Sequence, residues 1–169
     1  MPSLSAHGLS VATPPGWEGR IFRRAGYGEA AASSDVVGPV APPGAQTFPV
    51  LHAATIPLPS NVADYASDAV EDLGPSDSIV VLKEFAPANA DEALFGAVGL
   101  PRSIDPDDFA PNVLQRRIAG QGGYQHFFHE GERAFCLYVI LGSFANRNQV
   151  VPNVDRVLAT ITIGPSATS

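Results

Sequence analysis

The chain has little of what proteins use for covalent cross-linking, dense surface charge or membrane insertion. Its 169 residues include one cysteine and a single lysine, and charged residues are 16% of the composition. One cysteine excludes an intrachain disulfide, and no apolar run approaches the ~18 residues that cross a bilayer. The N-terminal residues also lack the basic and apolar regions of a signal peptide. We therefore expect a soluble, cytoplasmic protein.

The balance of charge narrows the range of partners. The formal net charge is −7, which disfavours long-range attraction to nucleic acid and to anionic membranes. Hydrophobic residues are 45% of the chain, so a globular core is expected without a metal or a disulfide. The length suits one domain covering residues 1–169. Glycine and proline, 16 of each, indicate many turns and loops.

The clearest structural signal lies in residues 124–142. Two apolar runs, Tyr124–His129 and Ala134–Leu141, are joined by a short turn that contains Gly131. The second run is apolar throughout, which is typical of a central strand covered on both faces. We predict a β-hairpin here, with the second run in the core of the sheet.

Alternation and turn residues predict further strands along the chain. These strands cover residues 9–13, 20–24, 48–56, 78–85 and, less clearly from the pattern, 113–118. Residues 25–47, rich in Gly, Pro and Ala, are predicted to form a long loop, and residues 164–169 a short tail. Residues 93–100 are expected to form a short helix or turn, and residues 160–163 to be extended.

Two longer helices follow from apolar residues at helical spacing. The first spans Val62–Leu73, where one face is apolar and the other acidic, with Gly74 at its end. The second begins near Pro152 and includes Val154 and Leu158, while Asp105 and the proline after it predict a separate helical turn. Strands joined by tight turns favour antiparallel pairing. The predicted fold class is α+β, a single-domain sandwich of a mainly antiparallel sheet with a few packed helices.

The opening LSVATPPGW, residues 9–17, resembles the strand and Pro-x-Gly-Trp start of the PsbP-like superfamily. The strand, glycine-bounded loop and closing amphipathic helix over residues 142–163 are similar to that superfamily too. The resemblance implies an α/β/α sandwich around an antiparallel sheet. It also implies a non-catalytic binding or accessory role in a larger assembly, and it assigns no ligand residues.

His126 and His129, followed by Glu130, form the one His/Glu cluster in the sequence. On a helix, ligands at this spacing would share a face, but in a strand the odd offset places them on opposite faces. The strand assignment therefore argues against a shared metal ion, and we expect no metal site and no cofactor.

Other short motifs have plainer explanations. Residues 26–31 match a relaxed dinucleotide-binding pattern but lack the acidic residue that should follow, and residues 120–123 suit a tight turn better than an anion-binding loop. The acidic residues at 105, 107 and 108 suit a helix start better than a calcium loop. Cys136 lies inside an apolar strand, where a thiol is usually a small core residue rather than a nucleophile.

No catalytic constellation emerges, so the sequence favours a non-enzymatic protein-interaction or accessory module, a candidate subunit of a larger assembly. Its expected partner is another protein or a second copy of the chain. The alternative is a domain that binds a small ligand or anion, or hydrolyses it, in a cleft near Arg116, Arg117, His126 and His129.

Overall fold

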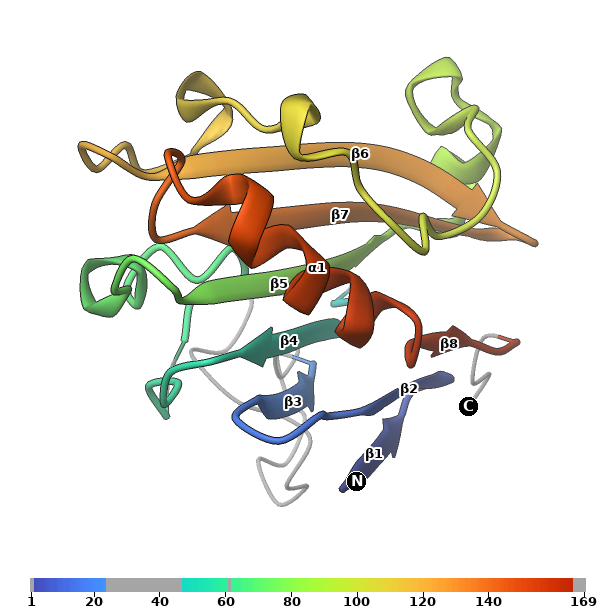
Figure 1. Cartoon of the computed structure of the whole chain (residues 1–169). Coiled ribbons are helices and arrows are strands. Elements are labelled where there is room, and N and C mark those ends of the chain that lie inside the picture. Colours follow the sequence, from blue (N-terminus) through green and yellow to red (C-terminus); the bar gives the residue numbers. More distant parts are fainter. Residues whose placement is uncertain (1, 24–46, 61, 166–169) are drawn as a thin grey trace.

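The computed structural model describes residues 2–23, 47–60 and 62–165, and its fold is α+β with two antiparallel sheets (Figure 1). The predicted loop over residues 25–47 lies outside the described residues, except for Thr47, as do the dinucleotide-like motif and most of the predicted tail. Strands form where apolar and β-branched residues alternate or run together. Their bounds are β1 Ser3–Ala6, β2 Leu9–Ala12, β3 Glu18–Phe22, β4 Val50–Ala54, β5 Ser78–Phe85, β6 Gly122–Glu130, β7 Arg133–Leu141 and β8 Thr162–Ile163.

The larger sheet has the strand order β3-β4-β5-β7-β6, and all of its neighbours are antiparallel. β7 is buried along its whole length, as its unbroken apolar run predicts. The predicted hairpin is confirmed: β6 pairs with β7 from Gly122 opposite Leu141 to Glu130 opposite Arg133. β6 is therefore an edge strand of this sheet.

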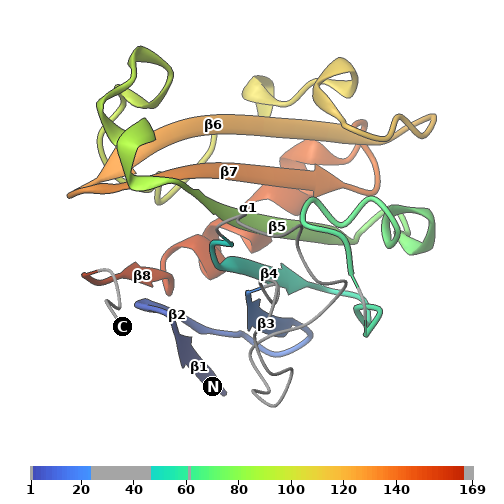
Figure 2. The same ribbon diagram turned by 180° about the vertical axis from the view of Figure 1, so that it is seen from behind.

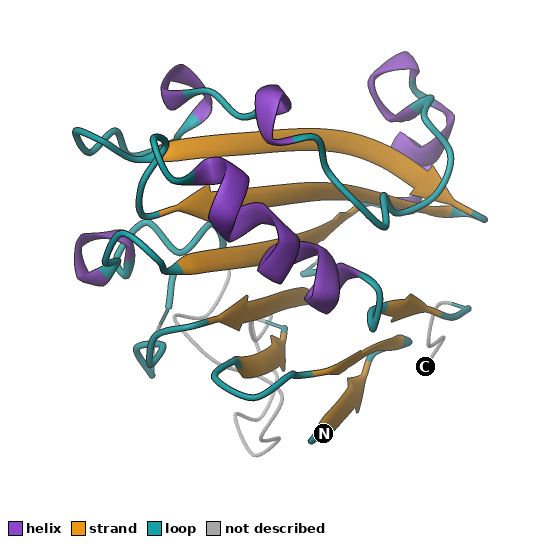
Figure 3. Cartoon of the chain, in the orientation of Figure 1, coloured by secondary structure: helices purple, strands orange, loops and turns teal. Residues whose placement is uncertain are grey.

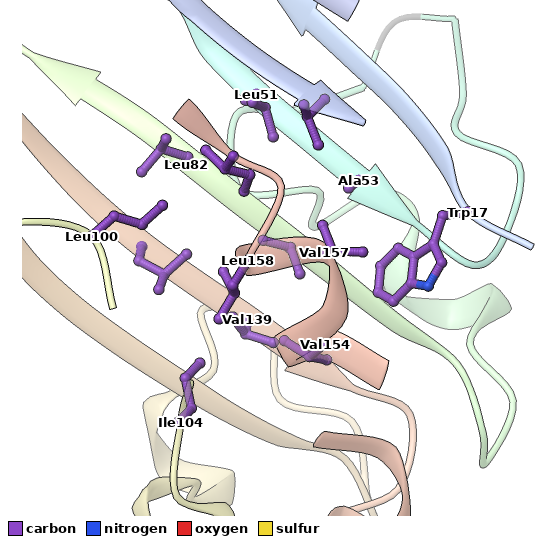
Figure 4. Packing of buried hydrophobic residues seen from close by; sticks show 14 of the residues in the cluster. Trp17, Leu51, Ala53, Leu82, Leu100, Ile104, Val139, Val154, Val157 and Leu158 are labelled. Atoms are coloured by element: carbon purple, nitrogen blue, oxygen red, sulfur yellow. The ribbon is translucent and has the colours of Figure 1, made fainter. Parts of the chain in front are cut away.

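One α-helix, α1 (Arg147–Leu158), crosses one face of the larger sheet (Figures 1 and 3). Its valines and leucine pack against strand residues and Trp17, and this cluster is the larger part of the core (Figure 4). The opposite face is covered by residues 56–73 and by loop residues near 113–118. The core therefore lies on both sides of the central strands.

The smaller sheet has the order β1-β2-β8 and lies beside β3 and β4 in Figure 1. β1, which the sequence pattern did not indicate, forms a hairpin with β2 through a two-residue turn, His7-Gly8. Both turn residues have positive φ, 55° and 76°, as a type I′ turn requires, and such a turn matches the right-handed twist of the two strands. Of the extended segment predicted over residues 160–163, Thr162–Ile163 forms β8 and pairs with β2, whereas Thr160 lies in a turn.

The prediction of a helix over Val62–Leu73 is wrong, although its apolar residues are buried as the pattern indicates. Only Val70–Asp72 forms a 3₁₀ turn, and Ala66 has a φ of 58° that no right-handed helix contains. The carbonyl oxygen of Asp64, which a helix would bond internally, accepts instead from His52 Nε2 at 2.7 Å. Polar tertiary contacts therefore replace the helical ones, while the apolar residues still cover the sheet.

Two other predictions need correction. Residues 113–118 do not form a strand: Pro111–Val113 is a 3₁₀ turn, and the next residues follow an irregular path, with the backbone N–H of Gln115 donating to Tyr138 Oη at 2.7 Å. α1 begins at Arg147 rather than near Pro152, because the carbonyl of Asn146 accepts the first helical bonds at 2.9 and 3.0 Å. Proline thus lies inside the helix, not at its start.

The predicted turns at residues 93–100 and 105–108 are confirmed as short 3₁₀ segments, Ala93–Phe95 and Pro106–Asp108. Asp105 caps the second, accepting from the backbone N–H of Asp107 at 2.9 Å. No helix in the described ranges is long and apolar enough to span a membrane.

Candidate functional site

The two arginines of the predicted cleft bond to neighbouring segments of the chain. Arg116 donates to the carbonyl of Ser67 at 3.0 Å and forms an ion pair with Glu71. Arg117 donates to the carbonyl of Asn112 at 3.2 Å. Both side chains thus help to hold surface segments together.

The two histidines lie on opposite faces of β6, as the strand assignment predicts. The ring of His126 stacks between Tyr124 and Phe128, with centroids 6.2 and 6.0 Å away, and burial lowers its pKa. His129 donates from Nδ1 to the carbonyl of Phe95 at 2.6 Å. The structure therefore does not bring the two imidazoles together around one point.

The glycine-rich turn at residues 120–123 uses its amides internally. The N–H of Gln121 donates to the carbonyl of Ile118 at 3.1 Å, and the N–H of Gly123 donates to the carbonyl of Ala110 at 2.9 Å. The buried side chain of Gln121 also donates to the carbonyl of Val70 at 2.8 Å. These bonds fit the turn interpretation of this motif.

Two groups with catalytic potential are buried in the core. Burial raises the pKa of the Cys136 thiol to about 11, so the reactive thiolate is scarce at neutral pH. Burial also lowers the pKa of His52 to about 4, and its Nδ1 has no hydrogen-bond partner among the described residues. Neither side chain is accessible to a substrate.

Arg133 is a buried charged residue, 4% exposed, with an extensive set of hydrogen bonds. It forms a bidentate pair with Glu84, with N–O distances of 2.9 and 2.6 Å. Its remaining donors bond to the carbonyls of His7 at 3.0 Å, Gly8 at 3.3 Å and Gly164 at 2.9 Å. Because five bonds match the five N–H groups of a guanidinium, this side chain is saturated and ties the two sheets together.

A large cavity lies next to this arginine, at the turn between β6 and β7. It has a volume of about 530 Å³, within the range of ligand and docking pockets. We call it the tip cavity. Its lining comes from three separate segments: Pro87, Glu130 to Arg133, and Ile163 to Pro165. The β6–β7 turn, β8 and the segment 86–99 lie at the same end of the molecule in Figures 1 and 2.

The tip cavity combines apolar walls with unpaired acidic groups. Pro87, Ile163 and Pro165 supply the apolar surface. Glu130 and Glu132 also line it, and neither forms an ion pair within the part of the chain that is described.

Exposed apolar side chains also occur in the segment 86–99, at the same end of the molecule. Leu94 is 59% exposed and Val98 is 80% exposed, and they belong to the small set of large hydrophobic residues with exposed side chains in the described ranges. Val98 bridges to His129 on β6, and the neighbouring Gly99 lies next to Glu130. The segment 86–99 thus reaches the same end of β6 as the cavity, but Phe95 packs with Phe85 and Phe127 on the face of the sheet opposite to Arg133.

The second cavity, of about 280 Å³, lies near Lys83, whose Nζ is 2.7 Å from Asp64 Oδ2. The rings of Tyr65 and Phe85 flank this ammonium at 5.4 and 5.6 Å. None of Arg116, Arg117, His126 and His129 lines either cavity. Over the described ranges, no three His, Cys, Asp or Glu side chains gather in an arrangement that would hold a metal ion.

Sequence reasoning missed the tip cavity and the saturated arginine. The local signal was the turn sequence His-Glu-Gly-Glu-Arg over residues 129–133, in which one basic residue follows two acids. Nothing in that sequence says that the arginine points into the core while the acids stay outside. That division depends on Glu84, which lies on another strand.

The chain was compared with protein-family models, with curated proteins and with solved structures, and none of the three comparisons found a match.

Proposed function

We propose that this chain is a non-enzymatic protein-interaction module that binds a segment of a partner protein in the tip cavity. The supporting observation is the cavity of about 530 Å³, whose walls include the apolar residues Pro87, Ile163 and Pro165. A hollow of this size with apolar walls is typical of a binding site.

The state of the reactive groups supports binding rather than catalysis. Cys136 and His52 are buried with pKa values shifted toward their neutral forms, and Arg133 uses every donor within the protein. The glutamates of the tip cavity have no neighbouring histidine or free arginine in its lining to complete an acid–base pair. Their best-supported role is recognition.

The resemblance to the PsbP-like superfamily leads to a related proposal, that the module is an accessory subunit of a larger assembly. A cytoplasmic location and the absence of nucleic acid among its partners are parts of the same proposal. Both are motivated by the composition and by the net charge of −7.

The alternative of a ligand-binding or hydrolytic cleft near Arg116, Arg117, His126 and His129 stays a prediction. The separate partners of these side chains give that alternative less geometric support than the tip cavity has.

Peptide display followed by NMR mapping tests the proposed function. Random seven-residue peptides are selected on the folded protein, and the enriched peptides are titrated into ¹⁵N-labelled protein. We expect the largest shifts at the backbone amides of Gly131, Glu132 and Gly164, which line the tip cavity. Failure to enrich any peptide, or shifts confined to other surfaces, would contradict the proposal.

A further inference from the structure

We infer that the tip cavity receives an arginine or lysine side chain carried by an apolar stretch of the partner protein. This inference rests on the proposed function and specifies the chemistry of the segment that is bound. It follows from the charge of the cavity, from its apolar walls and from the residues around its mouth.

The charge of the cavity is negative and uncompensated. Glu130 and Glu132 line it without a cationic partner in the described ranges, whereas Arg133 is neutralised by Glu84 at 2.6 Å. Because the arginine also has no free N–H group, it cannot serve as the counter-ion for a bound acid. A cationic side chain is therefore the complementary occupant.

Acidic residues in the segment 86–99 also favour a basic ligand. The segment 86–99 carries Asp91 and Glu92, both exposed, and contains no lysine or arginine. The segment 86–99 thus adds negative charge to this end of the molecule, where Arg102, exposed and bonded to the carbonyl of Leu158, is a cation near β8. Long-range attraction to negative charge raises association rates and selects against acidic partners.

The apolar walls favour a protein segment over a free amine as the bound ligand. Pro87, Ile163 and Pro165 offer surface to the methylene stem of an arginine or lysine and to apolar neighbours on the same chain. A polyamine would neutralise the glutamates but leave this apolar area uncovered.

Two other occupants fit less well. The chain's own residues 166–169, Ser-Ala-Thr-Ser, contain no basic group. A second copy of the chain brings another net charge of −7, so that two copies repel each other at long range. A separate, basic partner is favoured over both.

The test uses three matched peptides, acetyl-Ser-Val-Xaa-Leu-Ser-amide, in which Xaa is Arg, Gln or Glu. Each is titrated into the ¹⁵N-labelled protein at low salt and at high salt. We expect the Arg peptide to bind about tenfold more tightly than the Glu peptide at low salt, with the ratio falling at high salt as the charges are screened. Spermidine, and acetyl-Ser-Ser-Arg-Ser-Ser-amide, are expected to bind more weakly than the apolar Arg peptide.

Two variants assign the preference to the cavity. Glu130→Gln combined with Glu132→Gln should bring the Arg-to-Glu ratio to within about twofold of one, because the charge is lost while the walls remain. Asp72→Asn removes an exposed acid that does not line the cavity and should leave the ratio unchanged.

The outcomes separate this inference from the proposed function. If the three peptides bind the cavity equally, the basic preference is wrong and the docking function stands. If neither these peptides nor the display-selected ones shift the cavity amides, both are wrong. Tighter binding of spermidine than of the Arg peptide, or self-association abolished by the double Gln variant, would replace the basic protein segment with a different occupant.

Discussion

Two sets of charges lie within four residues of each other on the β6–β7 hairpin, and their surroundings differ completely. Arg133 is 4% exposed and has a partner for every N–H group. Glu130 and Glu132 line a cavity and have no ion-pair partner in the described ranges. The comparison teaches that a charged side chain is structural when the protein itself provides all of its hydrogen-bond partners. A charged side chain without such partners is open to a ligand.

The largest expected effect on stability comes from replacing the buried residue of this comparison, Arg133. Arg133→Met should reduce the free energy of unfolding by about 3–5 kcal/mol, because the carboxylate of Glu84 is left buried and unpaired. Glu132→Gln should change it by less than about 0.5 kcal/mol, since that side chain is exposed. Urea unfolding of both variants measures the difference. Similar losses of unfolding free energy in the two variants would contradict the distinction between a structural arginine and a glutamate that is free to bind a ligand.

A second prediction concerns His52, an interior group that is neutral rather than paired. Its folded pKa of about 4 lies below the usual 6.5, so the unfolded chain binds this proton first as the pH falls. Stability should therefore decrease on acidification from pH 6.5 to pH 4, by about 3 kcal/mol from this group alone.

His52→Leu is the matched variant for that measurement. The wild-type protein should lose stability relative to this variant as the pH is lowered, whatever the constant offset between the two at pH 7. A difference that does not change with pH would show that the imidazole is not buried in its neutral form.

A third prediction compares backbone N–H groups of β6 that are bonded within the sheet with N–H groups that are not. In β6 the even-numbered residues face β7 with their N–H groups, whereas those of Gln125 and Phe127 point to the open edge and have no backbone partner in the described ranges. His126→Pro should therefore reduce stability by about 2–3 kcal/mol, and Gln125→Pro by less than about 1 kcal/mol. Equal losses in urea unfolding would mean that the strand is paired on both sides.

Much of the sheet is predictable from the sequence because its strands are locally distinct. β5 has the predicted bounds, and the β6–β7 hairpin follows from two apolar runs around a glycine turn. The segment 62–73 was not predictable in the same way. Its apolar spacing is real, but Ala66 at positive φ and the bond from His52 to the carbonyl of Asp64 come from tertiary contacts that periodicity does not encode.

The candidate site was less predictable than the fold. The tip cavity joins Pro87, the hairpin turn and β8, which are far apart in the sequence. The sequence places glutamates at the hairpin turn, but only the position of Glu84 on the adjacent strand β5 shows why Arg133 is unavailable to neutralise them. Because tertiary packing brings these three segments together, the site has no characteristic spacing of residues in the sequence.

The most direct test of the central claim fills the tip cavity without changing its charge. Pro87→Trp places a bulky side chain in the lining, and Ala88→Trp places the same side chain on the adjacent exposed residue, which does not line the cavity. The affinity of a display-selected peptide is measured for both variants and for the wild-type protein. The account predicts at least about tenfold weaker binding for Pro87→Trp and a change within about twofold for Ala88→Trp. Wild-type affinity in the Pro87→Trp variant would contradict it.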